Sequence, residues 1–259
     1  MPTIKERMLS FGEIANMQDS LNAVINKQWR NIGHKESLTV HNFATELLVE
    51  SVELIEDSGV EHAWWKQVKQ DNFDSFNVKI EIIDMLHFFI SQVILVETKR
   101  KQNKFSVPVL WDQLYMGVDV TEMFADGESD LDKLLNDGNK LNHEIFATML
   151  HEMTGIFKFE NPEVTDDIFY RYCYGLFHSF LSYPGISCQE MSAIYQAKME
   201  LNRFRQSKGY KTGNYKKVVD GVEDNQRLQS IVNEFMEDTS KTLAWVRKKT
   251  RDAFFQSTV

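Results

Sequence analysis

Two pairs of carboxylates in this 259-residue chain stand three residues apart, at the spacing that places both members on one face of a helix. The first pair is Glu50 and Glu53, and the second is Glu81 and Asp84. The second pair lies in a segment, residues 80–96, that is apolar on nearly every side, so we expect its helix to be buried. Buried carboxylates need cations or strong donors. If the two helices pack together, the four carboxylates converge on a site suited to Mg²⁺ or Mn²⁺.

Three other interpretations of these acids have to be weighed. The first pair continues into Glu46 and Asp57, which is typical of a solvated helix face. The second pair could be a buried ion pair with Lys or Arg, although no basic partner stands nearby in the sequence. Asp84 and His87 also match half of a di-iron site, which requires a carboxylate-x-x-His motif on each of two helices. No other histidine has an acid three residues before it, so the sequence disfavours iron.

A basic face near the C-terminus provides the opposite charge. Lys198, Asn202 and Arg205 share one helix face, and residues 198–217 hold seven basic residues against a single acid. This is either a solvated basic patch or a phosphate site, in which Arg offers a planar fork and Lys a mobile charge. Residues 209–225, rich in Gly, Lys and Tyr, predict a loop that is ordered by itself or by a ligand. An acidic metal site with a basic phosphate face indicates a nucleoside polyphosphate hydrolase.

The elements that must position these residues are helical. Helical periodicity dominates, and 12 glycines and 4 prolines interrupt it, so we expect an all-α fold. We expect one catalytic domain over residues 1–259, with residues 99–165 as a mobile helical subdomain, and Asp74 or Ser75 as the N-cap of the third helix. The expected helices cover residues 10–27, 40–57, 77–98, 130–158, 164–181 and 188–207, with one or two more after Glu223.

Composition excludes several classes of protein. The net charge of −9 makes the chain a poor general binder of nucleic acid, whose affinity comes largely from phosphate neutralisation. The two cysteines, Cys173 and Cys188, suggest reduced thiols in a cytoplasmic protein. The longest apolar run, from Met85 to Val96, is too short and too polar to cross a bilayer. We therefore expect a cytoplasmic protein that binds neither nucleic acid nor membranes.

Four blocks of the sequence resemble one known family. They read MQDSLNAVINKQWR at 17–30, ESVEL at 50–54 followed by WWK at 64–66, NVKIEIIDMLHF at 77–88, and KMELNRFRQSKGYKTGNYKKVVDGVEDN at 198–225. Together they are similar to the dimeric all-α dUTPases of kinetoplastids, some bacteria and phages, within the all-α NTP pyrophosphatase superfamily. The chain departs from the family pattern around His62, at Lys79 and at Met199.

The resemblance implies a compact multi-helix bundle of the NTP pyrophosphatase type that forms a homodimer. It implies hydrolysis of dUTP, and of dUDP, to dUMP with release of pyrophosphate or phosphate, by a water that Mg²⁺ activates, with Mn²⁺ able to substitute. Two alternatives stay open: a pyrophosphatase for dCTP or a modified pyrimidine nucleotide, and a dUTPase-like regulatory protein that binds a partner. The implied metal ligands are Glu50, Glu53 (which also helps to activate the water), Glu81 and Asp84; the phosphate ligands are Lys198, Arg205, Tyr210 and Lys217; and the nucleoside ligands are Gln18, Asn22, Trp29, Asn202 and Asn225.

Overall fold

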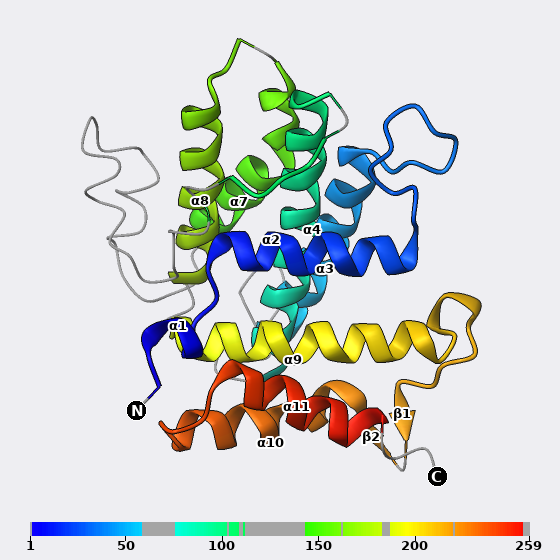
Figure 1. The fold of residues 1–259 in the computed structure, drawn as a ribbon, viewed down its shortest axis with the longest axis vertical. Coiled ribbons are helices and arrows are strands. Elements are labelled where there is room, and N and C mark those ends of the chain that lie inside the picture. The colour runs from blue at the N-terminus through cyan, green and yellow to red at the C-terminus, as the bar shows by residue number, and fades with distance from the viewer. Residues whose placement is uncertain are drawn as a thin grey trace, which may run out of the picture.

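The chain folds into packed helices with one short pair of strands (Figure 1). The computed structural model describes residues 2–58, 76–102, 104–108, 111, 143–161, 163–182, 187–219 and 221–255. The predicted all-α class is confirmed. The helices are α1 (Ile4–Arg7), α2 (Phe11–Ile25), α3 (Val40–Ser58), α4 (Phe76–Arg100), α7 (His143–Thr154), α8 (Asp166–Ser182), α9 (Cys188–Ser207), α10 (Asp224–Glu237) and α11 (Leu243–Phe255), with 3₁₀ turns η1 (Gly155–Glu160) and η2 (Tyr210–Thr212) and strands β1 (Val218–Val219) and β2 (Val222–Glu223).

Most of the predicted helix boundaries agree with the structure within two residues. The last long helix, α9, begins and ends where the sequence predicts, and two further helices follow Glu223. The helix expected over 130–158 is an exception, because α7 ends at Thr154 and the 3₁₀ turn η1 follows from Gly155. Glycine is a poor helix former, which explains the change at this point. Residues 130–142, the proposed cap at Asp74 or Ser75, and much of 99–165 lie outside the described residues.

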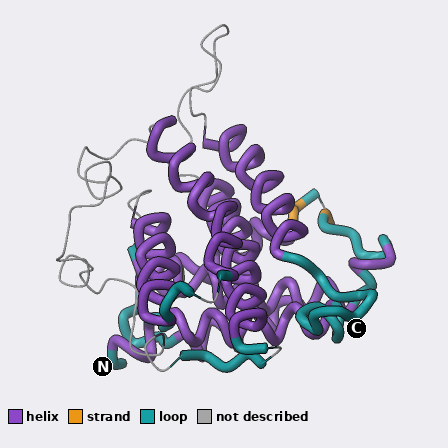
Figure 2. The backbone as a smooth tube through the Cα atoms, turned by 90° about the horizontal axis from the view of Figure 1, so that it is seen from above, coloured by secondary structure: helices purple, strands orange, loops and turns teal. Residues whose placement is uncertain are grey.

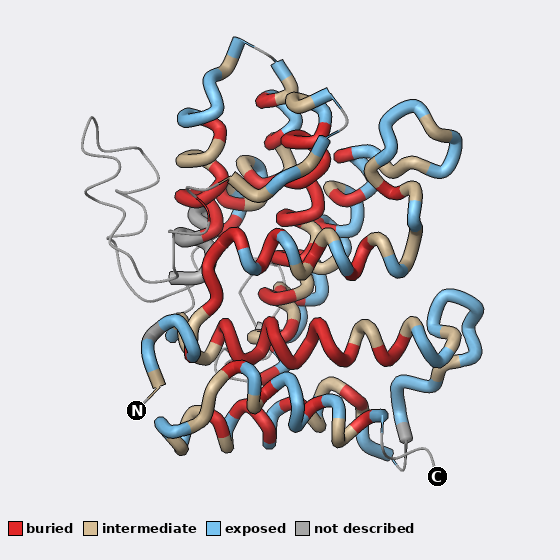
Figure 3. The backbone as a smooth tube through the Cα atoms, viewed as in Figure 1, coloured by how far each residue is buried: buried red, intermediate tan, exposed pale blue. Residues whose placement is uncertain are grey.

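Helix α4 forms the centre of the fold. Eighteen of its 25 residues are buried, and it packs against α2, α3, α9 and η1. Helix α9 lies between α2 on one side and the α10–α11 pair on the other (Figures 1 and 3). It is buried continuously from Met191 to Leu201, as the red stretch in Figure 3 shows. The acids predicted on α4 and the basic residues predicted on α9 are therefore carried by two core helices that contact each other.

Local signals fix the ends of the helices that build the site. Ser10 and Glu13 form a reciprocal capping box at the start of α2, with hydrogen bonds of 3.1 and 2.7 Å. Ser187 caps α9 by accepting a hydrogen bond from the backbone N–H of Glu190. Helix α9 ends before Gly209, whose φ of +80° favours glycine, and a Cβ there would lie 3.0 Å from the Thr212 hydroxyl.

The two short strands are peripheral. They pair antiparallel, Val218 with Glu223 and Val219 with Val222, and lie at one edge of the molecule when it is viewed from above (Figure 2). Among the described helices, none combines the length and the apolar character that a membrane span requires. The acids predicted from the sequence lie on α3 and α4, and the predicted basic helix face lies on α9, so the junction of these helices with α2 is the part of the fold that bears on function.

Candidate active site

A cavity of about 610 Å³ lies where α2, α3, α4 and α9 meet the segment that follows α9. Its volume is within the range of small-molecule sites, about 300–1,000 Å³. Every site residue predicted from the sequence, with the exception of Trp29, lines this cavity. These residues are Gln18, Asn22, Glu50, Glu53, Glu81, Asp84, Lys198, Asn202, Arg205, Tyr210, Lys217 and Asn225.

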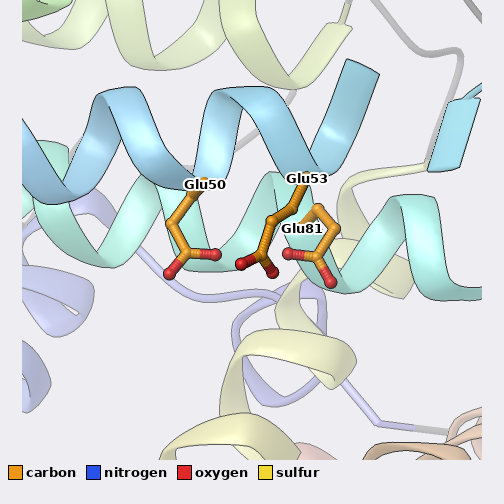
Figure 4. A group of neighbouring side chains, drawn as sticks. All are labelled: Glu50, Glu53 and Glu81. Carbon is orange, nitrogen blue, oxygen red and sulfur yellow. The ribbon is translucent and has the colours of Figure 1, made fainter. Parts of the chain in front are cut away.

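Three of the four predicted metal ligands form a compact cluster. Glu50 and Glu53 project from α3 toward Glu81 on α4 (Figure 4). One carboxylate oxygen from each residue lies within 4.8 Å of the others. The three-residue spacing on α3 places both glutamates on the face that packs against α4, so helix packing alone brings the acids together.

The environment of this cluster favours the protonated form of two of its acids. Burial raises the pKa of Glu50 to about 7, and the charges of Asp84 and Glu53 add to the effect. Burial likewise raises the pKa of Glu81 to about 8, again with a contribution from Asp84. The Oε2 atom of Glu81 is buried and has no hydrogen-bond partner among the described residues. The negative charges of these carboxylates repel one another, and a set of ligands made only of oxygen atoms fits a hard divalent cation such as Mg²⁺ or Mn²⁺.

The fourth predicted ligand, Asp84, is paired with a cation from the protein itself. The ammonium of Lys198 lies 2.7 Å from its Oδ2 atom and also donates to Oδ1 of Asn225 at 3.1 Å. The Lys198 side chain is only 1% exposed. The ion-pair interpretation of Asp84 is therefore correct in part, with a basic partner that comes from α9 and not from the surrounding sequence.

Arg205 is held by an acid that the sequence analysis did not single out. Its Nε and Nη2 atoms donate to the two carboxylate oxygens of Asp224 at 2.9 and 2.6 Å, and Tyr215 donates to the same carboxylate at 2.8 Å. Although burial acts to raise the pKa of Asp224, the hydrogen bonds and charge of Arg205 lower it. Asp224 thus fixes the buried guanidinium of Arg205 in the lining of the cavity. No local pattern could have revealed this pair, because the loop 209–223 separates its members.

The segment after α9 covers one side of the cavity. The ring of Tyr210 lies 5.8 Å from the guanidinium of Arg205 and 5.9 Å from the ammonium of Lys217. The ammonium of Lys211 donates to the backbone carbonyl of Ile25, at the C-terminal end of α2, at 3.2 Å. The segment predicted as a loop is therefore folded into a short 3₁₀ turn and a strand pair, and it bridges α9 to α2.

A buried polar network lies on the α2–α4 side of the cavity. The Nδ1 atom of His87 lies 2.6 Å from Oε1 of Gln18, which also accepts from the hydroxyl of Tyr195 at 3.1 Å. Gln18 donates to Oδ1 of Asn22 at 3.0 Å, and Asn22 donates to the hydroxyl of Ser91 at 2.9 Å. Burial lowers the pKa of His87 to about 4, so the imidazole is neutral at physiological pH.

A family model for dUTPases matches residues 10–210, more than three quarters of the chain. The chain belongs to the dUTPase family. No curated protein matches it significantly. Membership assigns this dUTPase-family protein to the hydrolases of nucleotide metabolism. The matched span includes the carboxylate cluster, Lys198 and Arg205, whereas Lys217 and Asn225 lie beyond its end.

Trp29 is the one predicted nucleoside ligand that the structure does not bring to the cavity. Its side chain is 1% exposed and packs edge-on against Phe43, with 5.8 Å between the ring centroids. Its Nε1 atom is buried without a hydrogen-bond partner among the described residues. In this dUTPase-family structure Trp29 is part of the loop between α2 and α3, and its side chain is buried in the core. The neighbouring family block at 64–66 and His62 lie outside the described residues.

The cavity of the dUTPase-family protein also has lining residues that the sequence analysis did not propose as site residues. Asn77 stands one helical turn before Glu81, and that spacing could have indicated it. In the sequence, His87 stands out only as half of a di-iron motif with Asp84. The remaining lining residues include Asp57, Phe88, Gln206 and Glu223.

Proposed function

We propose that this protein is a divalent-metal-dependent dUTP diphosphatase that converts dUTP, and also dUDP, to dUMP with release of pyrophosphate or phosphate. The observation that carries the proposal is the cavity itself. A cluster of three glutamates, two amides on α2 and three basic side chains line one space of about 610 Å³. Opposite charges around one cavity suit a ligand with an anionic tail that binds both through a cation and through basic groups.

Glu50, Glu53, Glu81 and Asp84 are the proposed ligands of Mg²⁺, for which Mn²⁺ can substitute. When bound, the metal neutralises phosphate charge and lowers the pKa of a coordinated water. Glu53, the exposed member of the cluster, is the proposed acceptor of a proton from the attacking water. The buried, unpartnered Oε2 of Glu81 supports the proposal, because a cation would satisfy it.

Lys198, Arg205, Tyr210 and Lys217 are the proposed phosphate ligands. An ammonium has three donors, and Lys198 uses two of them on Asp84 and Asn225, which leaves one for a phosphate oxygen. Arg205 directs its Nε and Nη2 atoms to Asp224 and Asn225, and its Nη1 atom, 3.3 Å from Asn202, keeps a second N–H for the ligand.

Gln18, Asn22, Asn202 and Asn225 are the proposed nucleoside ligands, because amide groups can read both base edges and sugar hydroxyls. Discrimination against the thymine methyl group and the ribose 2′-hydroxyl would rest on close packing in the cavity. Phe88, half-buried beside His87, adds an aromatic surface to the same wall. The wall thus combines apolar area with directed polar groups, as sites for small ligands commonly do.

A hydrolysis panel tests the proposal. Purified protein is incubated with Mg²⁺ and each of dUTP, dUDP, dCTP, dTTP and UTP, with an EDTA control, and products are separated by ion exchange. We expect selective conversion of dUTP to dUMP and pyrophosphate that EDTA abolishes. Turnover of dCTP or of a modified pyrimidine nucleotide instead would keep the hydrolase chemistry and correct the base preference. No turnover of any nucleotide would favour a dUTPase-like regulatory protein that binds a partner.

We further propose a cytoplasmic homodimer. The outer face of α3 exposes Leu48, Val49 and Val52, each about half exposed, and an apolar face of this kind favours contact with another protein surface. Light scattering coupled to size exclusion measures the mass of the assembly. A monomeric mass at micromolar concentration would contradict the dimer, and cell fractionation tests the location.

A further inference from the structure

The hydrogen-bond network on the α2–α4 wall of the cavity determines which nitrogen of His87 carries the proton. A backbone carbonyl can only accept, and the carbonyl of His87 accepts from the hydroxyl of Ser91 at 2.7 Å. The oxygen of Ser91 must then accept from Nδ2 of Asn22, so Oδ1 of Asn22 is turned toward Gln18. Gln18 therefore donates from Nε2, and its Oε1 faces His87.

A circuit of hydrogen bonds thus runs from the His87 backbone carbonyl through three side chains and returns to the His87 imidazole. Oε1 of Gln18 accepts from Nδ1 of His87, and the hydroxyl of Tyr195 donates to the same oxygen. Nδ1 is accordingly the protonated nitrogen of the neutral ring, and Nε2 carries a lone pair. The ring of Tyr195 lies against the imidazole, with centroids 4.6 Å apart, and holds its plane.

The lone pair on Nε2 has no partner among the described residues. The atom is buried, and His87 belongs to the lining of the cavity. A buried acceptor without a donor costs free energy, which a ligand with an N–H at this position would recover. Gln18 and Asn22 line the same wall, and each amide nitrogen retains one N–H beyond the bond it makes in the circuit.

We infer that Nε2 of His87 is the specificity-determining acceptor for the N3–H group of uracil, and that it makes the site select uracil over cytosine. The inference rests on the proposed function. Uracil presents an acceptor, a donor and an acceptor along O4, N3 and O2, which complements an imidazole lone pair beside two amide donors. Cytosine carries a lone pair at N3, so its N3 atom would oppose Nε2. A site built around a hydrogen bond rejects a ligand that leaves its groups unpaired far more strongly than it rejects a small change in size.

The test compares kcat/KM for dUTP and dCTP in the wild type and in His87→Gln. The glutamine amide reaches a similar position but can present either an oxygen or an N–H, so it accepts both bases. We expect the dUTP/dCTP ratio to fall by about tenfold or more, with a gain in dCTP turnover as well as a loss in dUTP turnover. Thymine has the same N3–H as uracil, so the dUTP/dTTP ratio should not change and serves as the matched control. An unchanged dUTP/dCTP ratio in a folded His87→Gln protein would overturn the inference.

Ser91→Ala provides a second route should His87→Gln fail to fold. This change lies outside the cavity lining, yet it removes the group that orients Asn22, so the same ratio should fall. In the wild type, ¹⁵N NMR of the imidazole reads the tautomer directly. Addition of dUMP should shift the Nε2 resonance of His87, and dCMP should not. A proton on Nε2, or equal responses to the two nucleotides, contradicts the assignment.

The two proposals fail in distinguishable ways. Wild-type protein that hydrolyses neither dUTP nor dCTP would overturn the diphosphatase and the base selection together. Wild-type protein that hydrolyses dUTP, combined with an unchanged ratio in both variants, would overturn only the role of His87.

Discussion

The ammonium of Lys198 and the carboxylate of Asp84 are 2.7 Å apart, although the residues are separated by 114 positions in the sequence. This contact joins the two core helices that carry the acidic and the basic walls of the cavity. The lysine neutralises one of four neighbouring carboxylates, and the charge of Asp84 in turn raises the pKa of Glu50 and of Glu81. The charge on Lys198 therefore influences proton binding at the cluster and would also influence the binding of the proposed metal.

Lys198→Met should separate these effects. Loss of the cation leaves the cluster more negative, so we expect Mg²⁺ to bind about tenfold more tightly at about pH 8 in the absence of nucleotide. Nucleotide turnover should nevertheless fall by at least about a hundredfold, because a phosphate ligand is lost. Titration calorimetry with Mg²⁺ measures the first effect, and Lys208→Met, an exposed lysine just past the end of α9, is the control. Weaker Mg²⁺ binding in Lys198→Met would contradict the competition between lysine and metal.

Glu53→Ala should abolish turnover while the fold stays intact. Glu53 is exposed at the cavity, so its removal costs little packing but removes the proposed proton acceptor, and we expect kcat to fall by about 10²–10⁴. Steady-state kinetics and a thermal melt are the measurements. Glu56→Ala, an exposed glutamate on the same helix that does not line the cavity, should retain wild-type kcat. Wild-type turnover in Glu53→Ala would remove Glu53 from the mechanism.

The stability of the metal-free protein should decrease as the pH rises. Glu50 and Glu81 have folded-state pKa values of about 7 and about 8, above the ordinary value of 4.5. At pH values between 4.5 and these raised values, the folded state therefore binds more protons than the unfolded state. The stabilisation from these protons is complete below about pH 4.5 and is lost as the pH rises through about 7–8. Thermal melts in EDTA should therefore show a Tm several degrees lower at about pH 8.5 than at about pH 5.5. Mg²⁺ should reverse the trend, because it replaces the protons.

Glu81→Gln gives the control for this pH dependence. The substitution removes a titrating group without much change in volume, so the decline of Tm in EDTA should become shallower. A Tm in EDTA that rises with pH in the wild type would show that the cluster is not protonated in the folded state.

Asp224→Ala should destabilise the fold. It leaves the guanidinium of Arg205 buried without its bidentate counterion, and the loss of one partner of a buried pair typically costs about 3–5 kcal/mol. Chemical denaturation measures the free energy of unfolding. Asp19 makes a comparable bidentate contact with Arg30 at a more exposed position, so Asp19→Ala should cost less than about 1 kcal/mol. Equal losses in the two variants would show that the burial of Asp224 is energetically unimportant.

The sequence predicts the parts of the site that depend on local spacing. Glu50 and Glu53 could be paired because three residues span nearly one helical turn, and α9 ends just before the segment 209–225 that the sequence predicts as a loop. Contacts between distant segments could not be predicted in this way. The partner of Asp84 comes from another helix, and the tautomer of His87 depends on a circuit that includes Gln18 from α2.

Trp29 illustrates the limit of inference from a family block. The family resemblance implies that Trp29 is a nucleoside ligand, yet the chain after α2 turns so that the indole faces Phe43. Side-chain direction beyond the end of a helix depends on backbone angles, which sequence spacing does not specify. Gln18 and Asn22, both within the helix, do line the cavity.

The two helices that supply the carboxylates differ in how firmly the rest of the protein holds them. Helix α4 is enclosed along almost its entire length, so the amide hydrogens around Glu81 should be among the slowest in the protein to exchange with solvent. Within one subunit, helix α3 has an uncovered face, marked by Val49 and Val52, and in the monomer it should exchange faster than α4. In the proposed metal site, the α4 side is thus held more firmly than the α3 side. We expect an ion larger than Mg²⁺ to be accommodated by a shift of α3.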